Sequence, residues 1–92
     1  MKFDAYKIPL DNDGIKDYYG KEIQFYVFVL PGKCMDHESV EIYLGMEGYG
    51  IIDMIFGVPA ENAPEDIEEW VANMDADQWF RDEKLEMAKS AF

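Results

Sequence analysis

The sequence has very few side chains suited to nucleophilic or metal chemistry. It contains no threonine, a single cysteine (Cys34), a single histidine (His37) and two serines, Ser39 and Ser90. A hydrolytic triad would have to pair Ser39 with His37, two residues apart, which rarely aligns a nucleophile with its base. The lone cysteine cannot form an internal disulfide. We therefore expect a protein that is not an enzyme, has no cofactor and resides in the reducing cytoplasm.

The sequence also lacks any apolar run near the ~20 residues that a membrane-spanning helix needs. Residues 1–6 have no continuous apolar segment after their lysine, so we expect no secretory signal. Basic residues are scarce, with eight Lys and Arg against twenty Asp and Glu, a net charge of −12. Because nucleic acids and anionic membranes attract bases, we expect the protein to contact neither directly.

The acidic charge is concentrated in one part of the chain. Residues 1–33 hold five acids and five lysines, whereas residues 34–80 hold twelve acids and no Lys or Arg. Residues 81–92 are balanced, with three of each sign. A surface that only confers solubility usually mixes both signs, because unrelieved repulsion costs stability. The missing bases therefore predict that the negative field of residues 34–80 has a function.

Three segments in which apolar and polar residues alternate predict β-strands that pack one face on a core. They cover residues 22–29, 40–47 and 51–58, and residues 2–8 are a candidate edge strand. Pro31-Gly32 predicts a turn after the first segment. The side chains expected on the core are Ile23, Phe25, Val27 and Val29; Val40, Ile42, Leu44 and Met46; and Ile52, Met54, Phe56 and Val58.

The turn around Gly48 decides how the last two strands pair. Pairing Leu44 with Ile52 and Ile42 with Met54 keeps both core faces on the same side of the sheet. This register predicts an antiparallel hairpin with a loop of three or five residues.

Two helical segments follow the strands. Apolar residues spaced as i, i+3, i+4 and i+7 from Ile67 to Met74 predict an amphipathic helix, which residues 62–65 open with a capping side chain and a proline. A second capping pattern, with Asp75 as N-cap, predicts a break and a helix over residues 76–90. One kinked helix over 64–90 is the alternative. The second helix is expected to present Trp79, Phe80, Leu85 and Ala88.

The predicted fold class is α+β. The order of elements favours a three- to four-stranded antiparallel meander with the two C-terminal helices packed on one face, in a single domain of 92 residues. Before the first clear strand, residues 11–14 predict an Asx-rich turn. Residues 14–20, bounded by glycines, predict one helical turn.

Two short clusters carry metal-ligand side chains but do not have the spacing of known sites. Cys34, Asp36 and His37 have no second ligand pair elsewhere in the chain, as zinc sites usually do. Residues 11–14 place glycine fourth, where a calcium-binding EF-hand has it sixth. We expect solvated turns at both places and no metal, with a small metal-dependent protein as the weaker alternative.

Two surfaces of the predicted fold are candidates for recognising a partner. The first is the sheet face away from the core. Aromatic side chains and carboxylates alternate with the core residues along the strands, so both are expected on this face, where they could bind a partner. Either it contacts a partner, or the N-terminal segment or a second subunit covers it. Its expected members are Tyr26, Phe28, Tyr43, Ile51, Ile55, Glu22, Glu41, Glu47 and Asp53.

The second candidate is the solvent side of the helices. Either its acids only keep the protein soluble, or they form a negative surface that a basic partner recognises. Side chains at i and i+4 lie ~5–6 Å apart, not far from the spacing of successive phosphates along a nucleic-acid strand. The acids are Glu61, Glu65, Asp66, Glu68, Glu69, Asp75, Asp77, Asp82, Glu83 and Glu86.

The size, the acidic charge and the scarcity of catalytic groups resemble, as a class, phage-encoded antagonists of host nucleases. These include anti-CRISPR proteins and anti-restriction DNA mimics; immunity proteins of nuclease toxins are also similar. The resemblance implies an inhibitor that occupies the basic, nucleic-acid-binding surface of another protein. The alternative is a small regulatory or structural module that homodimerises or joins a complex through its aromatic sheet face. The expected partner-binding residues are Glu41, Asp53, Glu65, Asp66, Glu68, Glu69, Asp75, Asp77, Tyr26 and Tyr43.

Overall fold

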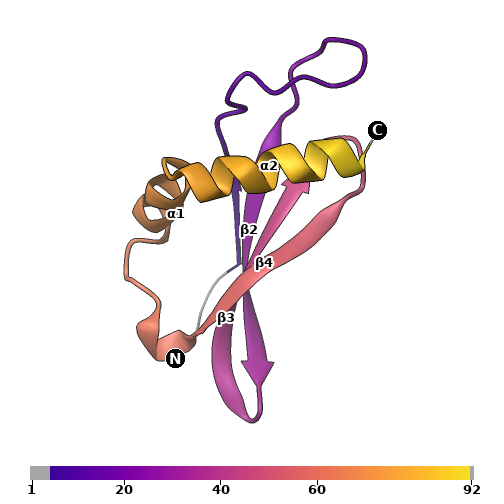
Figure 1. Cartoon of the computed structure of the whole chain (residues 1–92). Helices are drawn as coiled ribbons and strands as arrows, with labels where there is room; N and C mark the ends of the chain where they lie inside the picture. Colours follow the sequence, from indigo (N-terminus) through magenta and orange to yellow (C-terminus); the bar gives the residue numbers. More distant parts are fainter. Residues whose placement is uncertain (1–4, 92) are drawn as a thin grey trace.

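A four-stranded antiparallel sheet in the order β1-β2-β3-β4 precedes two helices, which confirms the predicted α+β meander. The computed structural model describes residues 5–91, apart from the side chain of Cys34. In Figure 1, α2 lies across the strands and the β2–β3 hairpin projects beyond the helices. The elements are β1 (Tyr6–Pro9), β2 (Phe25–Cys34), β3 (His37–Met46), β4 (Ile52–Pro59), the 3-10 helix η1 (Ala60–Asn62), α1 (Ile67–Asp75) and α2 (Gln78–Ser90).

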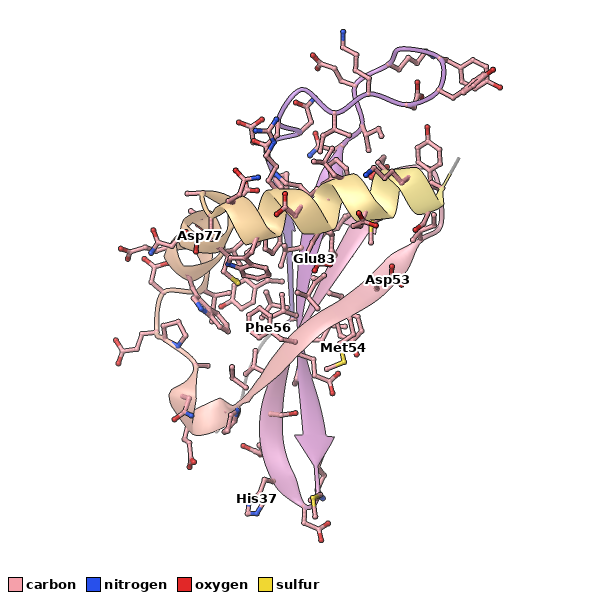
Figure 2. The ribbon with its side chains drawn as sticks, in the orientation of Figure 1. His37, Asp53, Met54, Phe56, Asp77 and Glu83 are labelled. Carbon is pink, nitrogen blue, oxygen red and sulfur yellow. The ribbon has the colours of Figure 1, made fainter. Side chains whose placement is uncertain are left out.

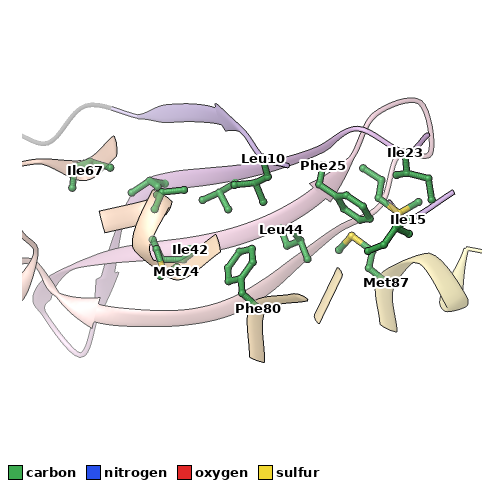
Figure 3. Packing of buried hydrophobic residues seen from close by; sticks show 14 of the residues in the cluster. Leu10, Ile15, Ile23, Phe25, Ile42, Leu44, Ile67, Met74, Phe80 and Met87 are labelled. Carbon is green, nitrogen blue, oxygen red and sulfur yellow. The ribbon is translucent and has the colours of Figure 1, made fainter. Parts of the chain in front are cut away.

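The core lies between the helices and one face of the sheet. Every residue predicted to face the core from the first two long strands is buried, and Val27, Val29, Val40, Ile42 and Leu44 have no exposed surface. The helices cover this face with a second set of apolar side chains, part of which Figure 3 shows. These are Ile67, Val71, Met74, Phe80, Met87 and Ala88. Both helices therefore pack on the same side of the sheet, as predicted.

The β1 strand is the edge strand predicted near the N-terminus. Its described part pairs antiparallel with β2, from Tyr6 opposite Val29 to Pro9 opposite Tyr26. The part of the prediction that falls on residues 2–4 lies outside the described residues.

The turn predicted at Pro31-Gly32 is wrong, because β2 continues through both residues to Cys34. The turn is formed by Met35 and Asp36, whose φ angles of 49° and 67° are both positive, as in type I′ turns. That turn type matches the twist of the flanking strands. Proline is tolerated in a strand where its nitrogen is not needed as a donor, and no residue among 5–91 pairs with Pro31 on the β1 side.

The predicted pairing of β3 with β4 is also wrong. Ile42 lies opposite Phe56, but Tyr43 lies opposite Met54, so the register shifts and Ile55 is left as an extra residue. The bulge reverses the faces of the first half of β4, because side chains alternate along a strand. Ile51 and Ile55 pack against the core, while Ile52 and Met54 are exposed. The antiparallel hairpin itself, with five residues (47–51) between the strands, is confirmed.

Two helices form rather than one kinked helix, but their caps differ from those predicted. The N-cap of α1 is Asp66, whose Oδ1 accepts a hydrogen bond from the Glu69 N–H at 3.0 Å, whereas Asn62 belongs to η1. The N-cap of α2 is Asp77, not Asp75, and its side chain forms no capping hydrogen bond. The chain does break near Asp75 as predicted.

The helical turn predicted around Tyr18 is a hairpin-like loop instead. Lys16 forms an isolated bridge with Glu22, and the Asp17 N–H donates to the Lys21 carbonyl at 2.7 Å. The Asp17 carboxylate accepts hydrogen bonds from the Tyr19 and Lys21 N–H groups at 2.8 and 2.9 Å. These local bonds satisfy the backbone without a helix.

Candidate functional site

Nine exposed carboxylates surround the helices and form what we term the acidic helical surface. They come from η1, the turn before α1, α1 itself, the junction between the two helices, and α2. Figure 2 shows Asp77 at the start of α2 and Glu83 in its middle, with Asp53 of β4 further along. The nine residues are Glu61, Glu65, Asp66, Glu68, Glu69, Asp77, Asp82, Glu83 and Glu86.

The apolar pattern of α1 directs its acids outward. Ile67 and Val71 are buried against the sheet, so Glu68 and Glu69 are left in solvent, as are Glu65 and Asp66 just before the helix. Asp66 also caps the helix, so one of these acids has a structural role. Acids near a helix N-terminus are stabilised by its dipole, which lowers the cost of holding them close together.

Two exposed bases stand among these acids. Arg81 and Lys89 are both exposed on α2. The Lys89 Nζ lies 3.8 Å from a Glu86 carboxylate oxygen, in a contact whose two side chains are 74% and 72% exposed. Exposed pairs of this kind contribute little to stability and are screened by salt. The acidic helical surface therefore keeps a strong excess of negative charge.

The third base of the helical segment, Lys84, is fully buried under α2. Its Nζ lies 2.5 Å from Asp13 Oδ2 and 2.6 Å from Asp75 Oδ1, and it donates to the Asp11 carbonyl at 2.8 Å. The other Asp75 oxygen accepts from the Asp11 N–H at 3.2 Å. Lys84 thus clamps the N-terminal turn against the α1–α2 junction, and its charge is neutralised inside the protein.

This clamp changes the status of Asp75, which the sequence placed among the partner-binding acids. The Asp75 side chain is only 16% exposed and is bound to Lys84. Sequence reasoning missed Lys84, although its spacing carried a signal. It lies four residues after Phe80 and four before Ala88, both buried, and so belongs to the apolar stripe of α2.

The sheet face opposite the helices carries the predicted aromatic residues. Three aromatic residues are half-buried there: Tyr26, Phe28 and Tyr43. The residues next to them in β2 and β3 point into the core, so these three side chains point to the opposite face. Glu41 shares this face and accepts a hydrogen bond from the Tyr43 hydroxyl at 2.7 Å. Asp53 does not, since it lies opposite the core residue Leu44. The predicted partner-binding residues therefore divide between two opposite sides of the molecule.

The tyrosines on this face remain protonated hydrogen-bond donors at neutral pH. The hydrogen bond to Glu41, followed by partial burial, raises the pKa of Tyr43. Partial burial, followed by the neighbouring Glu47 carboxylate, raises the pKa of Tyr26. Lys7 Nζ lies 4.3 Å from the centre of the Tyr26 ring, within the range of a cation–π contact.

Neither helix among residues 5–91 has the length and hydropathy needed to cross a membrane. Among the side chains that the structure describes, no three His, Cys, Asp or Glu residues gather in a group that could hold a metal ion. No protein-family model, curated protein or solved structure matches the chain. Its function must therefore be inferred from its own residues.

Proposed function

We propose that this protein is a non-enzymatic inhibitor whose acidic helical surface binds a basic, nucleic-acid-binding surface of another protein. The observation that supports the proposal most is the balance of exposed charge in the helical segment. Nine carboxylates are exposed there, while Lys84, one of only three bases, is fully buried. A cytoplasmic location and a mode of action like that of DNA-mimic antagonists of nucleases belong to the same proposal.

The mechanism would be electrostatic steering followed by competition. A dense negative surface attracts a positive cleft from a distance and raises the association rate, which falls steeply as salt is added. Glu65 precedes the N-cap of α1, so it does not share a helical spacing with Glu69, although both are exposed. Asp82 and Glu86 are four residues apart on α2 and both exposed, the spacing at which helical side chains lie ~5–6 Å apart. Carboxylates at this spacing would bind the Lys and Arg side chains of the partner that otherwise bind the phosphates of a nucleic acid.

The test measures binding to purified nucleases with basic clefts: an RNA-guided nuclease, a restriction endonuclease and a nuclease toxin. A basic protein that does not bind nucleic acid serves as the reference. We expect at least one nuclease to bind, to lose its cleavage activity and to release the protein when duplex DNA is added in excess. Raising NaCl from 50 to 300 mM should reduce the association rate by about tenfold or more.

The double variant Glu65→Lys/Glu69→Lys should weaken this binding by about tenfold or more. Glu22→Lys/Glu38→Lys is the matched control, because it makes the same charge change at exposed positions outside the helices. If neither salt nor the helical charge reversal alters binding, or if the control weakens it equally, the acidic helical surface is not the binding site. Failure of all three nucleases to bind would also contradict the proposal.

A further inference from the structure

The sheet face opposite the helices leaves large apolar side chains, such as Ile52 and Met54, uncovered by the described residues. Cross-strand partners in an antiparallel sheet share a face, so the register defines its rows. Lys7, Phe28, Tyr43 and Met54 form one row. We call this side the open sheet face; its main members are Lys7, Pro9, Tyr26, Phe28, Leu30, Glu41, Tyr43, Ile52 and Met54, with Glu47 at its margin.

This face is apolar and well packed within itself. Ile52 and Met54 are 57% and 53% exposed, although they are large hydrophobic residues. The Phe28 ring covers Gly45 so closely that a Cβ there would lie 2.9 Å from a ring carbon. Exposed apolar patches of this kind on small proteins mark interaction surfaces. The β4 bulge contributes directly, because it turns Ile52 and Met54 outward.

We infer that the open sheet face binds a second copy of this chain, so that two sheets pack face to face around a two-fold axis. This inference goes beyond the proposed function and does not depend on it. The first argument is charge. In a protein of net charge −12 the open sheet face carries one base, Lys7, and two acids, Glu41 and, at its margin, Glu47 beside Tyr26. A two-fold pairing uses the same patch twice, so Lys7 of one copy can face Glu41 of the other.

The distribution of the remaining charge favours the same arrangement. Packed sheets lie ~10 Å apart, and each helical layer lies on the far side of its sheet. The two acidic helical surfaces would then be separated by much more than the Debye length of ~8 Å at physiological salt. Contact through any part of the helical layer would instead bring carboxylates together. The open sheet face is thus where two such acidic chains can meet with the least repulsion.

The area is sufficient for a weak, specific dimer. The strands have 4, 10, 10 and 8 residues. At ~3.3 Å per residue and ~4.8 Å between strands they give a flat area of about 500 Å² per copy. Two copies together bury about 1,000 Å², without the additional surface of side chains that protrude from the sheet. This area is the lower limit for a specific interface. We therefore expect dissociation in the micromolar range.

Sedimentation equilibrium over 5–500 µM protein tests the inference. The expected result is a transition from 10.7 kDa to about twice that mass, together with a melting temperature that rises with protein concentration. Raising NaCl should preserve or strengthen the dimer, because its interface is apolar. A monomer at every concentration with a constant melting temperature would overturn the inference without need of any variant.

The double variant Ile52→Lys/Met54→Lys should raise the dissociation constant by about 100-fold or more, since it places four charges in the interface. Met35→Lys/Asn73→Lys is the control: it adds the same charge at exposed positions outside the face and should leave the dimer intact. A dimer unaffected by the first variant would show that another surface pairs the chains. Because Glu65→Lys/Glu69→Lys leaves this face unchanged, loss of nuclease binding and loss of dimerisation are separable.

Discussion

At the scale of single residues, Lys84 is the most unusual feature of the protein. Removing an ammonium group from water costs several kcal/mol unless charged and polar partners replace the lost solvation. Here two carboxylates and the Asp11 carbonyl replace it. The clamp joins residues more than seventy positions apart, because Asp11 lies between β1 and β2 and Lys84 lies in the last helix. It therefore holds the N-terminal turn to the helical layer.

We expect Lys84→Met to lower the free energy of unfolding by about 3–5 kcal/mol, because it leaves Asp13 and Asp75 without their cation. Lys89→Met is the matched control; its side chain is 74% exposed, so a change within about 0.5 kcal/mol is expected. Urea unfolding measures both. Adding Asp13→Asn and Asp75→Asn to Lys84→Met should restore part of the loss. Equal stability of Lys84→Met and the wild type would contradict the clamp.

Asp17 makes the stability of the loop over residues 16–22 depend on pH. The hydrogen bond from the Lys21 N–H, with those from Tyr49 and Tyr19, lowers the pKa of Asp17 below 3.8. Because the folded pKa is lower than the unfolded one, the ionised carboxylate stabilises the folded state above the unfolded pKa. That contribution is lost as pH falls through the folded pKa.

The stability advantage of the wild type over Asp17→Asn should therefore be constant at neutral pH and shrink below about pH 4. Urea unfolding at a series of pH values measures it. Tyr49→Phe in both backgrounds isolates the hydrogen bond from the Tyr49 hydroxyl to Asp17. An advantage that persists unchanged at the lowest pH would show that the charge of Asp17 is unimportant.

At the scale of elements, the sequence predicted the kind of each long strand and helix but not the details of their ends. Period-two alternation in β2 and β3 identified the buried residues, because both strands keep one register over their length. It failed in β4, where a bulge inserts Ile55. A bulge changes which neighbour a residue faces without changing the local sequence pattern, so only the paired strand reveals it.

The caps show a similar limit. The sequence predicted N-caps at Asn62 and Asp75, whereas Asp66 and Asp77 occupy the N-cap positions in the structure. Tertiary contacts decide among them: Asp75 is bound to Lys84, so α2 begins after Asp77 instead. Local propensity cannot anticipate such a long-range partner. The candidate site is affected too, because Asp75 was expected at the surface.

The caps allow a matched comparison. Asp66→Ala should lower the free energy of unfolding by about 1 kcal/mol, because its side chain caps the Glu69 N–H. Asp77→Ala removes the same charge from the N-cap of α2 but breaks no capping hydrogen bond, so a smaller loss is expected. Thermal and urea unfolding of both variants measure the difference. If the two losses are equal, the Asp66 hydrogen bond does not contribute.

At the scale of the whole molecule, the protein has two unlike sides. The helical side exposes nine carboxylates, and the sheet side exposes aromatic and aliphatic residues around one base and two acids. The sequence predicted both surfaces. Counting charges along the chain indicated the acidic helical side, and the alternation of residues along the strands indicated the aromatic sheet side. It could not separate the members correctly: Asp53 was assigned to the sheet side, and the exposure of Ile52 and Met54 there was missed.

If the acidic helical surface exists to bind a partner, it should weaken the isolated protein. Carboxylates crowded on one side repel each other, and salt screens that repulsion. We therefore expect the melting temperature to rise by about 4–8 °C between 20 and 500 mM NaCl, which corresponds to about 1 kcal/mol for a domain of this size. A flat or falling melting temperature would mean that the carboxylates do not repel one another measurably in the folded protein.

The triple variant Glu65→Gln/Glu69→Gln/Glu83→Gln distinguishes this repulsion from a general effect of salt. All three side chains are exposed, so the substitutions remove charge without disturbing the core. The variant should be more stable than the wild type at 20 mM NaCl and should gain less from added salt, because less repulsion remains to be screened. It should also bind the basic partner more weakly. A variant that gains stability but keeps full binding would show that these acids repel one another without recognising the partner, and the proposed site would have to lie elsewhere.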